Sequence, residues 1–426
     1  MLVERRPTPP RRFLALLITG TVLVCAGCQD DHVTAVQPKV GCALLDLQQV
    51  QGVASNENLT ALPRSNGNPG PTFVASVPIP ANYGIHDTFV RDGLAFVSAW
   101  NTGIMIFDVG NGIRGGSPSA PQLVTTYATP GGETHNSWWF WNPTTGQEKY
   151  LFVGREGPGT IGSSSLGDIH VLEVSDLTHP SEVACFRLDG AGTHNFWMDE
   201  SAQVLYAAYY NQGIVALDVS GTLSGDLSAR LIDSIRPGGL GNTYTWGVQL
   251  DNGSLYAIDM LSGFWQLRLS GGKFSVLAGG NNVPERYSSD LAVANGFAYT
   301  GTWGAGRTTG VAGNAVKVWK LDASGAPMLV DSIITPGILT VSDIKVSPDG
   351  KLLMFTAEYG PNAGFWFYSL ADPAKPTYVA QYLVPSPSNG VHTGKFATIG
   401  GRLYAFGAQD PSPPALLILD VTDIDQ

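Results

Sequence analysis

The sequence predicts an all-β protein, namely a seven-bladed β-propeller of four-stranded blades that is closed by an N-terminal strand completing the last blade. A pattern of strands and turns recurs every 43 to 59 residues, which is the length of a propeller blade. The chain holds 52 Gly and 28 Pro and only 14% charged residues, a composition typical of a turn-rich protein with a large apolar core. No long amphipathic helical pattern follows the N-terminal segment.

The first repeat shows the order of elements within a blade. An inner strand is expected at residues 86–91, followed by the tight-turn pair Asp92-Gly93. A second strand is expected at residues 94–99, a third at 104–109 and a fourth at 122–127.

The third strands resemble one another most closely, because they are rich in branched and aromatic residues, as buried strands should be. They are GIMIFDV from Gly103, IHVLEV from Ile169, GIVALDV from Gly213, FWQLRL from Phe264, VKVWKL from Val316, FWFYSL from Phe365 and ALLILDV from Ala415. Seven such strands indicate seven blades.

The last blade lacks a fourth strand after ALLILDV, and the missing strand is expected at the other end of the propeller. PTFVASVPIP, from Pro71, precedes the first inner strand and matches the pattern of the fourth strands. Pairing beside ALLILDV would close the ring and remove an exposed sheet edge. The propeller is therefore predicted to span residues 71–423.

The third strands GIMIFDV, GIVALDV and ALLILDV, together with the preceding run DTFVRDGLAFVSAW, resemble the LVIVD repeat. This repeat builds bacterial and archaeal β-propellers, and the resemblance covers about residues 71–423. It implies the architecture and no single activity, since one fold hosts many functions.

Residues 1–27 are predicted to be a lipoprotein signal peptide. Four arginines precede an apolar run that is too short for an ordinary spanning helix, and Cys25-Ala26-Gly27-Cys28 resembles a lipobox. A lipid on Cys28 would anchor the chain in the bacterial cell envelope, facing the periplasm or the cell surface. Gln29 favours the outer membrane, and residues 28–70 would be a flexible tether. Secretion after Gly27 and an uncleaved anchor are the alternatives.

Charge and cysteine content limit the partners. The net charge is −11 and no cluster of lysine and arginine follows the predicted signal peptide, which argues against nucleic acid and anionic membrane surfaces as partners. A monomer that binds an unidentified protein or small molecule is expected. Cys42 and Cys185 could form one disulfide in the oxidising envelope, or could be two separate buried thiols.

Four of the seven histidines stand at one equivalent position, at the start of an inner strand. They are His86 in GIHDTFV, His135 in ETHNSWW, His194 in GTHNFWM and His392 in GVHTGKF. Trp246, Ser289 and Ser342 take this position in the other three repeats. A closed ring would place all four histidines on one face, near the central channel, as an arc of four adjacent blades.

Other polar and aromatic residues are expected on the same face, as possible ligands or as support for the histidines. The residues that follow the repeated position or end a second strand are Asp87, Asn136, Asn195, Asp290, Asp343, Arg155, Glu156 and Glu358, and Trp246 joins them.

Three interpretations of the histidines remain open. Neutral imidazoles suit a transition metal such as copper, zinc or iron, with carboxylates as further ligands. Propellers of the selenium-binding protein and methanethiol oxidase family place copper-binding histidines in a comparable channel. That similarity is architectural, because their paired HH and cysteine motifs are absent here. Alternatively, the histidines lock neighbouring blades by hydrogen bonds or bind an organic ligand.

The expected function is a non-catalytic binding or interaction module that uses the histidine-bearing face. The alternative is a metal-dependent, copper-type oxidoreductase with a site at the mouth of the channel.

Overall fold

The structure is a computed structural model that describes residues 70–80, 84–129, 131–157, 167–280, 286–304, 313–321, 327–385, 388–410 and 413–424. The predicted signal peptide, Cys28, Cys42 and all but the last residue of the predicted tether lie outside these ranges. The described residues form 29 strands and one three-residue 3₁₀ helix, η1 (Ser228–Arg230). None of their helices is long and apolar enough to cross a membrane.

Four sheets hold four antiparallel strands each. They consist of β2 (Asp87–Arg91), β3 (Leu94–Ser98), β4 (Ile104–Asp108) and β5 (Gln122–Tyr127); β10 (Phe196–Asp199), β11 (Val204–Ala208), β12 (Ile214–Asp218) and β14 (Leu231–Ile235); β15 (Thr245–Asp251), β16 (Ser254–Asp259), β17 (Gly263–Ser270) and β18 (Lys273–Gly279); and β19 (Tyr287–Ala294), β20 (Phe297–Trp303), β21 (Ala315–Lys320) and β22 (Met328–Ile334).

Two further sheets depart from this plan. One consists of β6 (Thr134–Asn142), β7 (Gln147–Arg155), β8 (Asp168–Glu173) and β9 (Ser181–Arg187), with the short β13 (Gly225–Asp226) added in parallel beside β9. The other has eight strands, namely β23 (Thr340–Val346), β24 (Leu352–Glu358), β25 (Gly364–Ser369), β26 (Thr377–Leu383), β27 (Gly390–Ile399), β28 (Arg402–Asp410), β29 (Ala415–Asp420) and β1 (Thr72–Pro78). A single residue pair, Glu358 with Gly390, joins β24 to β27, so this sheet consists of two four-stranded halves.

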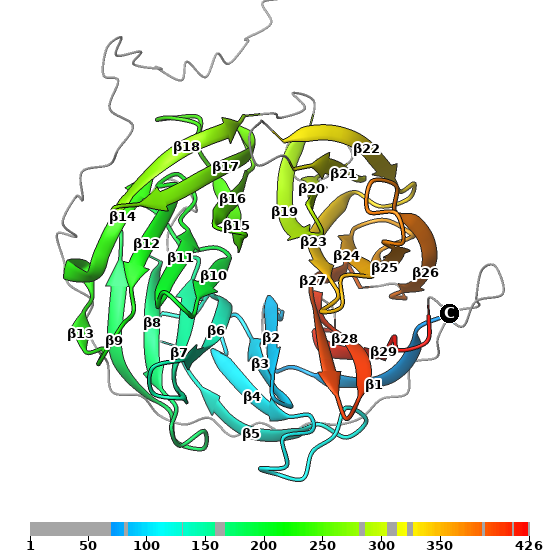
Figure 1. Cartoon of the computed structure of the whole chain (residues 1–426). Helices are drawn as coiled ribbons and strands as arrows, with labels where there is room; N and C mark the ends of the chain where they lie inside the picture. The colour runs from blue at the N-terminus through cyan, green and yellow to red at the C-terminus, as the bar shows by residue number, and fades with distance from the viewer. Residues whose placement is uncertain are drawn as a thin grey trace, which may run out of the picture.

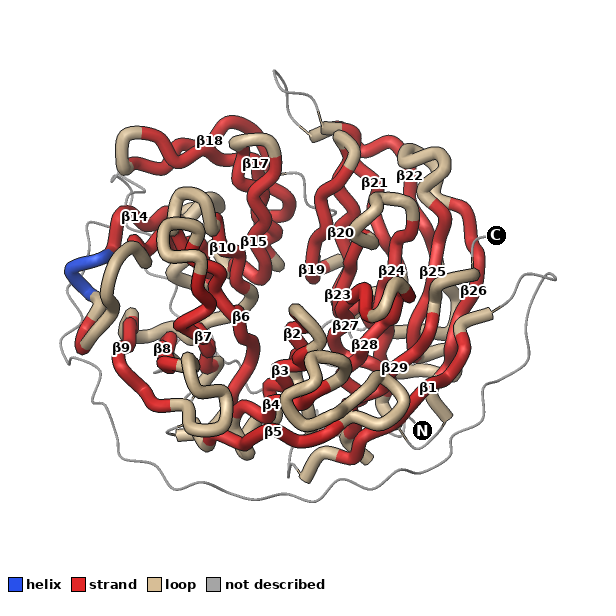
Figure 2. The backbone as a smooth tube through the Cα atoms, turned by 60° about the horizontal axis from the view of Figure 1, so that its bottom comes forward, coloured by secondary structure: helices blue, strands red, loops and turns tan. Residues whose placement is uncertain are grey.

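The sheets are arranged around a common centre, in an all-β, propeller-like fold (Figure 1). The seven strands nearest the centre, which we call the inner strands, are β2, β6, β10, β15, β19, β23 and β27. Each inner strand contacts the next one along the chain, and β27 also contacts β2. Figure 2, tilted from the first view, shows the same strands around the middle and η1 at one edge.

The strands of the first sheet agree with those predicted from the sequence. β5 has the predicted bounds, and β2, β3 and β4 are each one residue shorter than expected. All five residues of β4 are buried, which explains the apolar third strands of the repeat. Apolar side chains fill the space between neighbouring sheets. Phe96 of β3 and Trp139 of β6, for example, pack with ring centroids 5.1 Å apart.

The aspartate that ends several third strands holds the following turn. Asp108 accepts backbone hydrogen bonds from Gly110, Asn111, Gly112, Arg114 and Gly116, at 2.7–3.1 Å. Asp218 and Asp420 accept one each from the backbone two residues further on, at 2.8 and 3.0 Å. These bonds satisfy backbone donors that the strand ladder leaves unpaired.

β1 pairs with β29, as the sequence predicts, although about 340 residues separate them in the chain. The register runs from Thr72 opposite Asp420 to Pro78 opposite Ala415. Val77, opposite Leu416, is 1% exposed and belongs to the apolar cluster that β1 shares with the first sheet.

Val77→Asp is expected to lower the free energy of unfolding by about 4 kcal/mol or more, or to prevent folding, because it buries an unpaired carboxylate. Val276→Asp is the matched control. Val276 is 43% exposed on β18, so the same substitution should cost less than about 1 kcal/mol. Urea denaturation followed by tryptophan fluorescence measures both. An equally small loss of unfolding free energy in both variants would mean that β1 contributes little to the stability of the last sheet.

Candidate metal centre

The four repeated histidines lie side by side, although they come from opposite ends of the chain. The ring centroids are 4.1 Å apart for His392 and His86, 4.1 Å for His86 and His135, and 4.0 Å for His135 and His194. The sequence prediction of one neighbourhood for these side chains therefore agrees with the geometry.

Two tryptophans extend this row into a closed circuit of six rings. Trp246 lies 4.0 Å from His194, Trp303 lies 5.0 Å from Trp246, and His392 lies 6.3 Å from Trp303, all between ring centroids. We call these six side chains the aromatic layer. Trp246 thus occupies the place that a fifth histidine would take in the repeat.

Local irregularities in the inner strands explain how these rings come to face the centre. The register of pairing shifts between Thr134 and Asn136 in β6, and between Val391 and Gly394 in β27. His135 and His392 lie within these β-bulges. A bulge re-aims side chains that a regular strand would send to alternate faces. Both the histidine and the next polar residue can therefore face the centre.

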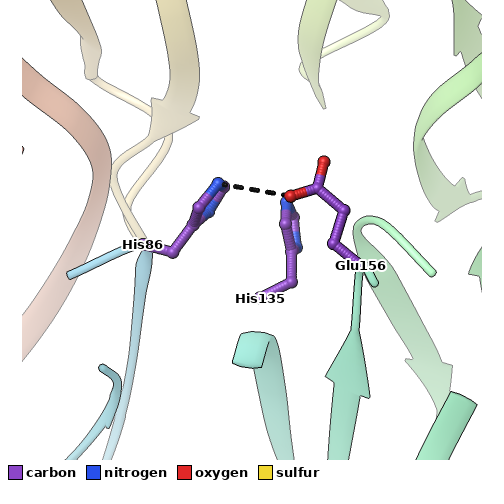
Figure 3. A group of neighbouring side chains, drawn as sticks. All are labelled: His86, His135 and Glu156. Atoms are coloured by element: carbon purple, nitrogen blue, oxygen red, sulfur yellow. Dashed lines mark ion pairs between the residues drawn. The ribbon is translucent and has the colours of Figure 1, made fainter. Parts of the chain in front are cut away.

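Glu156, just beyond the end of β7, completes a group of possible metal ligands with His86 and His135. One donor atom from each of the three residues lies within 4.8 Å of the other two (Figure 3). His86 Nε2 is 3.9 Å from Glu156 Oε2. The hydroxyl of Tyr210 donates a hydrogen bond to Oε1 of the same carboxylate.

Two aromatic residues beside this group have an uncommon backbone conformation. Trp100 and Tyr210 have φ of 42° and 45°, in the left-handed region that bulky side chains rarely adopt. Trp100 stacks on His86 with ring centroids 4.9 Å apart, and Tyr210 holds Glu156. Backbone strain of this kind tends to occur at functional sites.

His135 is fully buried, and neither of its ring nitrogens makes a hydrogen bond of standard geometry to a described residue. Burial, and then the nearby His194 and His392, hold its pKa well below the usual range, while a weaker hydrogen-bonding interaction with the side chain of Asn136 opposes this effect. The ring is therefore neutral at physiological pH. A buried, neutral imidazole of this kind is a candidate metal ligand.

The other two histidines are held by the protein. His194 places Nδ1 2.5 Å from the carbonyl oxygen of Trp246. His392 places Nδ1 2.8 Å from Glu358 Oε2, which also accepts a 2.6 Å hydrogen bond from Ser342. Hydrogen bonds of this kind fix the orientation of an imidazole.

The carboxyl groups of Asp290 and Asp343 are bound by a lysine, which is not the arrangement expected of metal ligands. Lys345 of β23 binds both, Asp290 Oδ2 at 2.9 Å and Asp343 through a shorter contact. Asn195 donates to the other oxygen of Asp290 at 3.0 Å. Burial raises the pKa of Asp343 well above its usual range, despite the lowering effect of Lys345.

Arg155 also faces other partners. Its Nε binds Asp168 at 2.6 Å, and Asp168 in turn lies 3.0 Å from His170. His170 Nδ1 is 2.6 Å from Glu182, and the two carboxylates raise the pKa of His170 to about 9 against the opposing effect of burial. This network belongs to the sheet of β6 to β9 and is structural.

Cys185 is buried in β9 and forms no disulfide with a described residue, and burial raises its pKa to about 12. Because Cys42 lies outside the described residues, the predicted disulfide stays a prediction.

Two lysines of the centre, Lys345 and Lys395, were not predicted from the sequence. They stand two residues after Asp343 and Thr393, which places each lysine on the same face of its strand as that residue. Asp87, Asn136 and both lysines line one cavity of about 110 Å³. Extending the alternation along each inner strand would have found both lysines.

Comparisons with known proteins support the fold alone. No family model and no curated protein matches the chain. Its structure resembles a chain of a solved structure titled "Crystal Structure of Mitotic Checkpoint Complex", with a TM-score of 0.57 and 13% sequence identity. The match covers 90% of this chain and 100% of that one. The likeness supports a β-propeller-like fold, and the resemblance to the LVIVD repeat stays a prediction.

The metal-free protein should lose stability as the pH falls below about 6.5, the pKa of an unfolded histidine. The unfolded chain takes up protons there, while the buried His135 and His194 resist them because their pKa values are lowered. Each of these histidines lowers the free energy of unfolding by up to about 1.4 kcal/mol for each pH unit below about 6.5. Chemical denaturation at pH 7.5, 6.5 and 5.5 measures the loss.

His135→Asn should reduce this slope of unfolding free energy against pH, because it removes one of the two buried imidazoles whose pKa values are lowered. An unchanged slope in His135→Asn would contradict a buried, neutral His135.

Proposed function

We propose that this chain is a lipid-anchored binding module of the cell envelope that holds one transition-metal ion at its central face, through His86, His135 and Glu156. The observation that carries this proposal is the buried His135. Neither of its nitrogens makes a hydrogen bond of standard geometry to a described residue, and it lies beside a second imidazole and a carboxylate.

The donor set fits such an ion. Two imidazoles and one carboxylate suit zinc, copper or iron, which take these ligands at about 2.0–2.2 Å. Atoms that share one ion therefore lie at most about 4.4 Å apart. The three donor atoms already lie within 4.8 Å of one another, so small side-chain rotations suffice. The lowered pKa of His135 keeps a lone pair available for the metal.

The alternative, that the histidines only lock neighbouring sheets, suits two of the four. His194 and His392 have hydrogen-bond partners from neighbouring inner strands or their sheets, Trp246 and Glu358. A locking role for His135 would require a hydrogen bond of standard geometry to a neighbouring sheet, and none is found among the described residues, since Asn136, with which the ring interacts, belongs to the same strand β6. His194 and His392 are therefore proposed to support the centre, and His86 and His135 to bind the ion.

The proposed architecture is a seven-bladed ring closed by β1. The pairing of β1 with β29 and the contact between β27 and β2 support it. The proposed anchor is a lipid on Cys28, supported by the lipobox-like Cys25-Ala26-Gly27-Cys28. A copper-type oxidoreductase would use the same centre, so metal binding is the step that both predicted functions share.

The test is equilibrium dialysis of the mature, untagged, metal-stripped protein against Cu²⁺, Zn²⁺ and Fe²⁺, followed by elemental analysis. About one ion per chain is expected for at least one metal. Removal of one of three ligands by His135→Asn or Glu156→Gln should weaken binding by about 100-fold or more. His179→Asn, at an exposed histidine, is the matched control and should bind as the unchanged protein does.

No uptake of any of the three metals would contradict the proposal, and so would equal binding by His135→Asn. Circular dichroism of each variant shows whether a loss of metal reflects a loss of the fold.

A further inference from the structure

A second group of reactive side chains lies farther along the inner strands than the aromatic layer. Lys395 of β27, Phe89 of β2 and Trp138 of β6 line both the 110 Å³ cavity and another of about 360 Å³. Arg91 and Asp92, at the far end of β2, line only the second cavity. Lys395 therefore lies where the two cavities meet.

The amine of Lys395 has no ion pair or hydrogen bond to any described residue. Instead, its Nζ lies 5.1 Å from the ring centre of Phe89 and 5.9 Å from that of Trp138. Asp290 and Asp343, two carboxylates of the cavity, are already bound to Lys345. Lys395 thus faces aromatic walls and open space, whereas Lys345 is bound by two carboxylates.

Burial and the charges around Lys395 make its amine easier to deprotonate than that of an ordinary lysine. Burial and then the Lys345 ammonium lower its pKa to about 8. Arg91 acts in the same direction, and Asp87 and Asp343 oppose it without reversing the result. Desolvation and a neighbouring cation are the two means by which proteins make a lysine nucleophilic at neutral pH.

We propose that Lys395 captures small aldehydes or ketones as an imine within this pair of cavities. The proposal rests on the unpaired amine, the aromatic walls and the two adjoining cavities, and it does not depend on metal binding at the aromatic layer. The cavity volumes limit the substrate to carbonyl compounds of a few heavy atoms.

The reaction needs no oxidant or reductant. The lone pair of the neutral Nζ attacks the carbonyl carbon, and one of the two protons on the nitrogen moves to the oxygen that takes up the C=O electron pair. The nitrogen of the resulting carbinolamine then loses its remaining proton and forms C=N, while the carbon–oxygen bond breaks and the hydroxyl group leaves with that proton as water.

The test traps the imine in the full chain with acetaldehyde and sodium cyanoborohydride at pH 7.0. Peptide mass mapping then gives the rate of N-ethylation at each lysine. At this pH a pKa of about 8 gives about 200 times more neutral amine than an ordinary pKa of about 10.4. Lys395 should therefore be labelled at least about tenfold faster than the exposed Lys320 and Lys375, and this preference should vanish in urea.

Two further measurements separate electrostatics from simple accessibility. The rate at Lys395 should rise with pH to a plateau with a midpoint near 8, which needs no variant. Lys345→Met should move that midpoint to higher pH, because it removes the neighbouring cation. Labelling of Lys395 no faster than that of Lys320 and Lys375, or only at a pH where these also react, would overturn the proposal.

Discussion

In five of the seven inner strands, namely β6, β15, β19, β23 and β27, the pairing register shifts at the position of the repeated histidine. A regular strand would turn the histidine and the following polar residue to opposite faces. The shift lets both face the common centre, and four of these strands, β15, β19, β23 and β27, contact one another in turn. His135, Trp246 and His392 of the aromatic layer stand at such shifts, and Asp290 and Asp343 stand at or beside them.

The centre has two layers that differ in charge. In the aromatic layer burial keeps His135 and His194 neutral, which suits them to a metal ion or to a hydrogen-bonding role. In the second layer, around the 110 Å³ cavity, Lys345 binds Asp290 and Asp343, and its charge also lowers the pKa of Lys395. One buried ammonium group thus influences the protonation of several groups around the cavity.

The sequence predicted much of this arrangement because repetition carries positional information. Equivalent histidines in separate repeats had to share one position in a ring. The match of PTFVASVPIP to the fourth-strand pattern predicted that β1 would pair beside β29. Orientation was harder to predict. Alternation alone cannot show that a bulge turns Asn136 and His135 toward the same space.

The partner that each polar side chain binds could not be predicted from the sequence either. Asp290 and Asp343 were grouped with the histidines because of their place in the repeat, yet they bind Lys345. Similarly, Arg155 was expected beside Glu156 at the centre, but it binds Asp168 within its own sheet. Residues adjacent in sequence at a strand end can point in opposite directions, and only the folded backbone decides which partner each one meets.

Metal binding at the aromatic layer can be tested most directly with crystals of the mature protein soaked in Zn²⁺ or Cu²⁺, by anomalous diffraction at the absorption edge of the metal. One strong anomalous peak bounded by His86, His135 and Glu156 is expected. Its absence, together with ordered and unliganded histidine rings, or a peak only at the protein surface, would contradict metal binding at this site.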